Sequence, residues 1–521
     1  MDSDEDLAGE GTEFGQREPL TRRIRTLLKD YADGLPVPKE LIQNADDAQA
    51  TEACLMLDLR THTTEQLIND KLAQFQGPAL VFWDNKPFQD ADFENLCEFG
   101  GETKLDDRKK VGKFGLGFNS VYNLTDLPQF VSKTSLCLLD PHEKFLRGKR
   151  GARYDLTAIR EKNGKHIADS MIGQLKPFDG LFGFSVDKIK SGEVFEGTIF
   201  RFPLRTEDHA KWSKICDEPY TIESAMELIE MTKGSSDLFL IFLQFVNKFE
   251  ICLKRDQGTE VLSNFGRNFL DSNDIGARVL FKLEDKFKSS YKIQIQDNQK
   301  SQSYQWDIFV TAPGKKSSDG TRCVGSIAFP SHDLDLRKNC QVRILFCFLP
   351  LPHPQDTGLP FLVNGTFAVT SSRRYLELNS ADDKSADKSS DGSWNRDILQ
   401  LGAAESLCTA VLTRSCTHSQ EHLFHLFPKM SNDADPLCKM VMETFYTRIA
   451  SDPLLTVFCC PNSLNLVALC NTKVFLISDD IPDNIRQSLS TCSAVLKPET
   501  LNGAIYLVLP PKILESDSSL V

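Results

Sequence analysis

Apolar side chains recur at three- and four-residue spacing over residues 20–31 and again over residues 38–50. This spacing predicts two amphipathic helices near the start of the chain. The second has Pro38 in its first turn, where a proline removes no backbone hydrogen bond. Two further helices are expected over residues 222–232 and 236–247, the latter because its apolar residues are nearly continuous.

Shorter stretches with alternating or uniformly apolar side chains predict strands. They cover residues 53–59, 79–84, 129–139, 195–205, 249–255, 276–283, 291–311 and 342–349. Because helices and strands follow one another along the chain, the expected fold class is α+β. We expect an α/β sandwich with helices on one face of a sheet, followed by a second α/β segment.

Changes in composition along the chain predict its domain organisation. Residues 1–13 are acidic and are expected to form a flexible tail. A first domain is expected over 14–210, a second over 220–430 and a small C-terminal α/β segment over 431–521. The low-complexity string NSADDKSADKSSDGS, residues 379–393, is expected to be a disordered loop in the second domain.

Composition also limits the partners. The formal charge of −13 disfavours nucleic acid, because it repels phosphate backbones. The richest apolar run, from Leu238 to Val246, is nine residues long and is expected to be a core helix, since a membrane span needs about 20 residues. The acidic start lacks the features of a signal peptide, so we expect a cytosolic or nuclear protein without a membrane partner and assign it to the cytoplasm. Its 15 cysteines are then expected to be reduced thiols.

The string ELIQNADDA begins at Glu40 and contains the first candidate site residues. Glu40 and Asn44 are one helical turn apart and project to the same side. A carboxylate there could accept a hydrogen bond from an attacking water, and a carboxamide oxygen could bind Mg²⁺. A polar, solvated helix face would show the same spacing.

The string GKFGLGFNS, which begins at Gly112, predicts a glycine-rich turn leading into a helix. At Gly115 and Gly117 the missing side chains would let backbone N–H groups approach phosphate oxygens, and Lys113 could add positive charge. Asp84 ends the apolar run ALVFW and could accept a hydrogen bond from an adenine amino group. An ordinary turn aspartate is the alternative for Asp84.

The order ExxxNxxDA, strand-end aspartate, GxxGxGF and a late Gly-Thr pair resembles the GHKL superfamily. This superfamily includes gyrase, ninety-kilodalton heat-shock chaperones, histidine kinases and MutL. The longer strings FGQREPLTRRIRTLLKDY, KELIQNADDAQAT and GKFGLGFNSVYNLTDLPQFVS resemble the chaperone-like modules of the sacsin family. This resemblance is strong over residues 14–205 and looser beyond, where FCFLPLP and GLPFLVNGTFAVTSSRR carry it.

The resemblance implies a chaperone or co-chaperone module that uses ATP and Mg²⁺ and acts on client proteins together with other heat-shock chaperones. Glu40 would be the general base for ATP hydrolysis, Asn44 the Mg²⁺ ligand and Asp84 the adenine contact. The other implied roles are phosphate contacts from Lys113, Gly115 and Gly117, support of the base from Thr198, a lid over 100–111, and a terminal-phosphate contact from Arg373 or Arg374.

One departure from the family pattern keeps a second hypothesis open. The family motif at the strand aspartate is usually DxGxG, whereas this chain has Asp84 followed by Asn85, Lys86, Pro87 and Phe88, without either glycine. Glycines allow the backbone to pass close to a nucleotide, but proline fixes φ and adds bulk. The alternative is therefore a nucleotide-independent protein-interaction scaffold with a degenerate GHKL pocket.

Two other functions are disfavoured. No histidine precedes Glu40, the first being His62, so the upstream phosphoacceptor helix of a histidine kinase is not expected. A metal site formed by Cys416, His418, His422 and His425 is also disfavoured, because no acidic or cysteine partner follows at a fixed spacing.

Overall fold

The computed structural model describes most of the chain between residues 18 and 468. The described residues are 18–29, 36–97, 117–159, 164–270, 286–317, 320–331, 345–351, 357, 359–369, 376, 390–415, 426–428, 436–452, 456–459 and 466–468. The chain divides into two compact units whose segments alternate along the sequence. Unit 1 comprises 1–34, 57–81 and 118–226, and unit 2 comprises 35–56, 82–117 and 227–521.

Unit 1 is built around an antiparallel sheet with short helices. Its strands are β3 (Gln129–Lys133), β4 (Ser135–Leu139), β5 (Gly151–Asp155) and β6 (Phe195–Pro203), in the order β6-β3-β4-β5. Its helices are α1 (Leu20–Leu28), η3 (Asp70–Phe75), η6 (Ile167–Met171), α4 (Ile172–Leu175), α5 (Val186–Lys190) and α6 (Glu207–Trp212). The register pairs Phe130 of β3 with Phe200 of β6, and both rings are buried.

Unit 2 contains a longer mixed sheet, in the order β13-β12-β14-β11-β10-β9-β8-β7-β1-β2. β1 (Glu52–Asp58) and β2 (Ala79–Asp84) contribute residues to both units. The other strands are β7 (Lys248–Arg255), β8 (Gly258–Phe269), β9 (Lys286–Asp297), β10 (Gln302–Pro313), β11 (Gly325–Pro330), β12 (Leu345–Cys347), β13 (Leu349–Pro350) and β14 (Leu362–Gly365). β12 and β14 are parallel, whereas β7 to β11 pair antiparallel. A separate hairpin joins β15 (Thr456–Cys459) to β16 (Leu466–Ala468).

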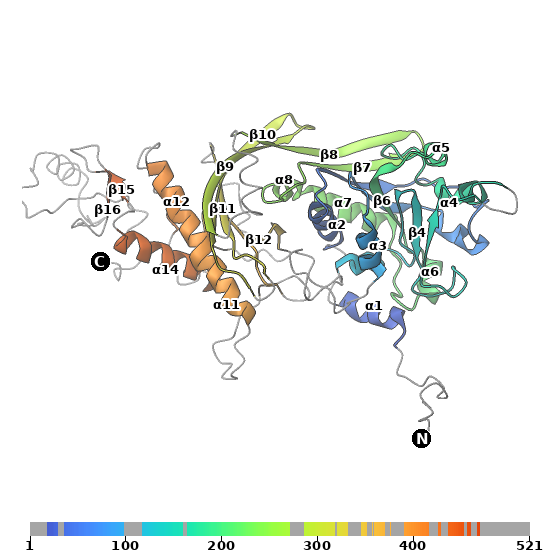
Figure 1. Cartoon of the computed structure of the whole chain (residues 1–521), viewed down its shortest axis with the longest axis horizontal. Helices are drawn as coiled ribbons and strands as arrows, with labels where there is room; N and C mark the ends of the chain where they lie inside the picture. The colour runs from blue at the N-terminus through green and yellow to red at the C-terminus, as the bar shows by residue number, and fades with distance from the viewer. Residues whose placement is uncertain are drawn as a thin grey trace, which may run out of the picture. The chain divides into compact units, whose positions relative to one another are not determined.

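The helices of unit 2 are α2 (Pro36–Asp47), α3 (Asp90–Cys97), α8 (Ser236–Phe239), α11 (Ser390–Asp397), the π-helical turn η7 (Ile398–Ala403), α12 (Ala404–Ser415) and α14 (Pro436–Ser451), with α7 (Ile222–Lys233) at the boundary. α12 lies against β10 and β11 (Figure 1). Gly325 of β11 meets Gly402 of η7 so closely that a Cβ at Gly325 would lie 2.5 Å from the Ala403 nitrogen. The close approach explains both glycines.

These observations confirm the expected α+β class. The helices expected over 20–31, 38–50 and 222–232 are present as α1, α2 and α7. The strands expected over 53–59 and 79–84 are β1 and β2. The domain ranges expected from the sequence stay a prediction.

The helix expected over residues 236–247 is wrong beyond its first turn. α8 ends at Phe239, and the following residues form turns although most of them are buried. Polar side chains from elsewhere in unit 2 replace the helical hydrogen bonds. The Asp46 carboxylate accepts hydrogen bonds from the backbone N–H groups of Gln244, Phe245 and Val246 at 2.7–2.9 Å.

Arg267 of β8 donates hydrogen bonds to backbone carbonyl oxygens of the same segment. Its guanidinium donates to the carbonyl oxygens of Leu240 and Leu243, and to the side chain of Asn247. Buried backbone groups need such partners. An apolar pattern alone could not reveal this arrangement, because Asp46 is 198 residues from Gln244 and Arg267 lies on a different element.

Two other expectations change in detail. The strand expected over 291–311 is a hairpin of β9 and β10, whose turn is held by Asp297 Oδ1, which accepts from the Gln299 and Lys300 amides. The loop expected over 379–393 lies mainly outside the described residues, but residues 390–393 belong to α11. The strand expected over 276–283 and the tail over 1–13 also lie outside them.

The described cysteines agree with the expectation of reduced thiols. Side chains are described for eight of them, and all eight are free. Six of them are buried in strands and helices of the two units or in the segment leading into β11.

We predict that Asp46→Asn destabilises the protein by about 2 kcal/mol or more, because an amide cannot accept all three hydrogen bonds and buried N–H groups lose their partners. The change would be measured as the shift in free energy of unfolding from denaturant titration. Asp256→Asn, in the exposed turn between β7 and β8, is the matched control and should change it by less than about 0.5 kcal/mol. Equal stability of the two variants would contradict the anchoring role of Asp46.

Candidate functional site

Glu40 lies in the second turn of α2, and its side chain is directed into unit 2. It is only 5% exposed, as expected for a residue on a helix face that packs inward. Its carboxylate lies directly against the backbone of Gly117, the last glycine of the GxxGxG string. Two motifs that are more than 70 residues apart in the sequence therefore meet in unit 2.

The close approach explains why residue 117 is a glycine. A Cβ atom at Gly117 would lie 2.7 Å from the carboxylate carbon of Glu40 and would overlap one of its oxygens. A side chain there would push the carboxylate away. Gly117 opens η5 (Gly117–Asn123), a 3-10 helix of seven residues where the sequence predicts a helix over 115–123.

Asn44 lies one turn after Glu40 and is exposed. Its carboxamide is therefore accessible to a ligand from solvent, and its oxygen is a hard ligand of the kind Mg²⁺ prefers. Asp47, at the end of α2, is half-buried. Asp46, between them, has the structural role already described. The sequence motif did not distinguish this structural residue from the candidate site residues on either side.

Asp84 ends β2 and is 5% exposed. Burial raises the pKa of Asp84 from 3.8 to about 7, because an ionised carboxylate is poorly solvated there, although the Lys86 amide opposes the effect by donating to Oδ1 at 2.9 Å. Near neutral pH this carboxyl group can therefore gain or lose a proton. The hydrogen bond from Lys86 is also typical of a turn aspartate.

Asn85 occupies the position after the strand aspartate and ties the end of β2 to the start of β1. Its side-chain oxygen accepts from the amides of Thr51 and Glu52, and its nitrogen donates to the Thr51 hydroxyl at 2.7 Å. Asn85 stands at a variable position of DxGxG, whose two glycines would fall at Lys86 and Phe88.

Thr198 lies in unit 1, within β6, and is fully buried. Its hydroxyl is 2.9 Å from that of Ser132 on β3, and Ser132 also donates to the carbonyl of Gly197. The Gly-Thr pair is therefore part of the hydrogen bonding between β3 and β6. Phe118, in η5, packs its ring at 5.6 Å from that of Phe200 on β6.

A buried ion pair fixes the end of η5 within unit 1. Arg205, which follows β6, donates to Asp126 Oδ2 at 2.8 Å and to the carbonyls of Tyr122 and Asn123. Both charged side chains are fully buried. The pKa of Asp126 is lowered: burial alone would raise it, but hydrogen bonds from His142, Arg205 and Ser213 and the charge of Arg205 outweigh the burial. The paired charges and the satisfied carbonyls hold the turn after η5 in place.

Lys39 is a half-buried cation that the sequence did not point to. Burial lowers its pKa to about 8, and its ammonium group donates to the carbonyl oxygen of Pro350 at 3.0 Å. It connects α2 to β13 in unit 2. No motif singled it out, since its partner is a backbone oxygen more than 300 residues away.

Unit 2 also has a cavity of about 260 Å³ with polar and charged walls. Its lining residues are Glu230, Lys233, Gly234, Asp237, Phe265, Asp297, Lys300 and Tyr304. The cavity is distinct from the sequence-predicted residues.

Several candidate residues lie outside the described residues. These are Gly112, Lys113 and Gly115 of the glycine-rich string, the lid expected over 100–111, Arg373 and Arg374, and the Cys416, His418, His422 and His425 group. Their roles stay predictions. Within the described part of the chain, no helix has the length and apolar character needed to cross a membrane.

We predict that Asp84→Asn changes how stability depends on pH. Between pH 4 and 7 the unfolded wild-type chain ionises Asp84 while the folded chain keeps the proton, so wild-type stability falls as pH rises and levels off above about pH 7. The full effect is at most about 4 kcal/mol. Denaturant titrations of both proteins at several pH values would test this.

The asparagine variant lacks this dependence, so its stability relative to wild type should increase from pH 4 to 7. Asp256→Asn serves again as the exposed control. Parallel stability curves for wild type and Asp84→Asn would show that the folded protein ionises Asp84 normally.

Comparison with known proteins gives two relatives and one family. The chain is 32% identical over 420 residues to "Sacsin" of Homo sapiens, an alignment that covers 75% of this chain and 9% of the human protein. It is 24% identical over 390 residues to "Protein NO VEIN" of Arabidopsis thaliana, covering 72% of this chain and 12% of that protein. The chain thus spans only a small part of the length of either relative. Residues 17–264 match the family model described as the Sacsin domain, so this is a sacsin-like protein.

Proposed function

We propose that the chain is a chaperone or co-chaperone module that binds ATP with Mg²⁺ and hydrolyses it, with Glu40 as the general base. The observation that carries this proposal is the contact between the buried Glu40 carboxylate and the Gly117 backbone. A carboxylate beside a glycine-rich turn lies where a phosphate chain and an attacking water would be held together.

Each described candidate residue has a distinct role in this proposal. Glu40, shielded from solvent, accepts the proton of the attacking water. Asn44, exposed on the same helix, offers its oxygen to Mg²⁺, which when bound neutralises phosphate charge. Asp84, once ionised, accepts a hydrogen bond from the adenine amino group. The family resemblance further implies support of the base from Thr198 and phosphate contacts from Lys113 and Gly115.

The alternative function is a nucleotide-independent scaffold for protein interaction. It is favoured by the departure from DxGxG, because Lys86 and Phe88 stand where the pattern has glycines. In either case the proposed partners are client proteins and other heat-shock chaperones, and the proposed compartment is the cytoplasm.

We predict that Glu40→Gln binds ATP but hydrolyses it at least about 100-fold more slowly than wild type, because general-base catalysis typically contributes this much. Calorimetric titration with ATP and Mg²⁺ would measure binding, and phosphate release would measure turnover. Glu94→Gln, an exposed glutamate of α3, is the control and should retain both activities.

Wild-type protein that neither binds nor hydrolyses ATP would refute the ATPase and leave the scaffold. Binding without any effect of Glu40→Gln on turnover would refute the role of Glu40 alone. Loss of binding in Asp84→Asn would support adenine recognition at the end of β2.

We further predict that Gly117→Ala abolishes hydrolysis while the protein remains folded. The new methyl group overlaps the end of the flexible Glu40 side chain, which can rotate away more easily than backbone can move. Turnover should fall to the level of Glu40→Gln, and the unfolding midpoint should change little. Gly77→Ala, at a glycine with open space around its Cβ position, is the matched control. Normal turnover in Gly117→Ala would show that the contact is not required for catalysis.

A further inference from the structure

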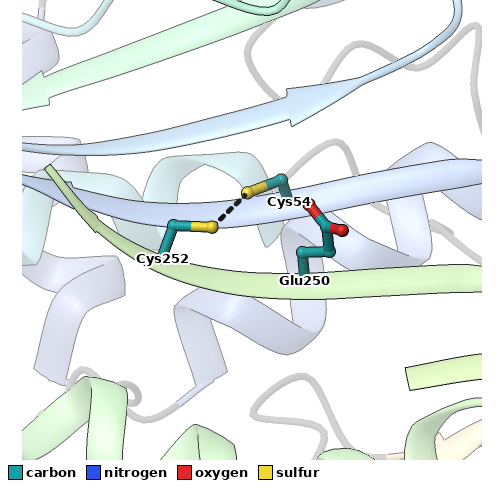
Figure 2. Close-up of side chains that lie close together, drawn as sticks. All are labelled: Cys54, Glu250 and Cys252. Atoms are coloured by element: carbon teal, nitrogen blue, oxygen red, sulfur yellow. Dashed lines mark hydrogen bonds between the residues drawn. The ribbon is translucent and has the colours of Figure 1, made fainter. Parts of the chain in front are cut away.

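Two cysteines from distant parts of the sequence meet inside unit 2. Cys54 lies on β1 and Cys252 on β7, which are neighbours in the sheet. Their sulfur atoms are 3.8 Å apart, and the side chains are 0% and 3% exposed. Figure 2 shows the two sulfur atoms pointing toward each other, with Glu250 of β7 beside them.

The three side chains have the spacing of a metal site. One ligand atom from each of Cys54, Glu250 and Cys252 lies within 4.8 Å of the others. In a tetrahedral Zn²⁺ site with Zn–S bonds of about 2.3 Å, two thiolates are separated by about 3.8 Å. The observed sulfur separation equals this value, so the thiols need no rearrangement to share a metal ion.

The surroundings orient the carboxylate. Lys248 approaches Glu250 Oε1 at 3.0 Å, and the Asn264 side chain donates to the same oxygen at 2.7 Å. Both contacts involve Oε1, so Oε2 can face a cation. Hydrogen bonds and ion pairs from neighbouring side chains usually hold a ligating carboxylate in position.

The charges of the neighbouring side chains are compatible with a bound divalent ion. With a divalent ion, two thiolates, the Glu250 carboxylate and the Lys248 ammonium group would have no net charge. A neutral cluster is the arrangement that a buried site tolerates best.

We propose that Cys54, Cys252 and Glu250 bind one Zn²⁺ ion. On binding, each thiol loses its proton to solvent and forms one Zn–S bond, Glu250 supplies one oxygen, and a water molecule occupies the fourth position. The ion joins β1, which directly follows the helix that carries Glu40, to β7.

The proposal predicts one thiolate-coordinated metal ion per chain. Reduced full-length protein would be titrated with Co²⁺, whose thiolate charge-transfer absorption reports sulfur ligands, and then with Zn²⁺ in competition with a chelator. Zn²⁺ should raise the unfolding temperature, since it binds the folded state. Affinity should fall as pH is lowered, because protons compete for the thiolates.

Variants separate this site from the other cysteines. Cys54→Ala and Cys252→Ala should each lose the Co²⁺ absorption and the thermal shift, and Glu250→Gln should weaken Zn²⁺ binding by at least about tenfold. Cys137→Ala, a buried cysteine on β4, is the matched control and should retain them. Unchanged absorption in Cys54→Ala and Cys252→Ala would overturn the proposal.

Wild-type protein gives a test that does not depend on variants folding. Bound Zn²⁺ should protect Cys54 and Cys252 from alkylation, as measured by mass spectrometry of digested protein. If hydrogen peroxide instead joins these two sulfurs in a disulfide while Zn²⁺ is saturating, with loss of two protons and two electrons from the thiols, the pair is a redox pair and the zinc proposal fails. ATP turnover does not enter either measurement, so the outcome is independent of the ATPase.

Discussion

The carboxylate of Asp46 is the constraint on which unit 2 depends. It accepts three backbone hydrogen bonds from residues 244–246, a buried segment that would otherwise leave its N–H groups without acceptors. Immediately after this segment, Asn247 and Lys248 donate to the carbonyl of Thr51. The end of α2 and the start of β1 are thereby fixed to the start of β7.

Both proposed sites of unit 2 follow from this attachment. Glu40 lies on the same helix as Asp46, so the anchor that fixes the end of α2 also fixes the direction of the Glu40 carboxylate toward Gly117. Cys54 lies on β1 directly after the attached turn, and the pairing of β1 with β7 brings it to Cys252. The proposed catalytic carboxylate and the proposed metal-binding thiol pair therefore depend on one structural aspartate.

The buried carboxyl groups of the two units differ in which protonation state is stable, and this difference distinguishes a structural carboxylate from a proposed ligand-binding one. Arg205 and Asp126 in unit 1 form a fully buried pair, and the lowered pKa of Asp126 shows that its ionised form is the stable one. Burial instead raises the pKa of Asp84 to about 7, which makes its ionised form costly in the folded protein. A ligand that donates to Asp84 would relieve that cost, and groups of this kind are enriched in functional sites.

The sequence by itself determined the local elements and the candidate chemistry. The three- to four-residue period predicted α1, α2 and α7, apolar stretches predicted β1 and β2, and the motif order identified Glu40, Asn44, Asp84 and Gly117 as a group. Such signals are local, because helix and strand periodicity depends on neighbouring residues. The motif could not separate Asp46, which holds the fold, from Asn44 and Asp47 beside it.

Only the tertiary structure decided the features that join distant residues. Leu238 to Val246 has the composition of a core helix, yet it ends its helix at Phe239 because Asp46 and Arg267 satisfy its backbone instead. Cys54 and Cys252 are nearly 200 residues apart, and only strand order brings them together. The physical reason is the same in both cases. A buried polar group bonds to the partner that tertiary packing places beside it, and local periodicity carries no information about that packing.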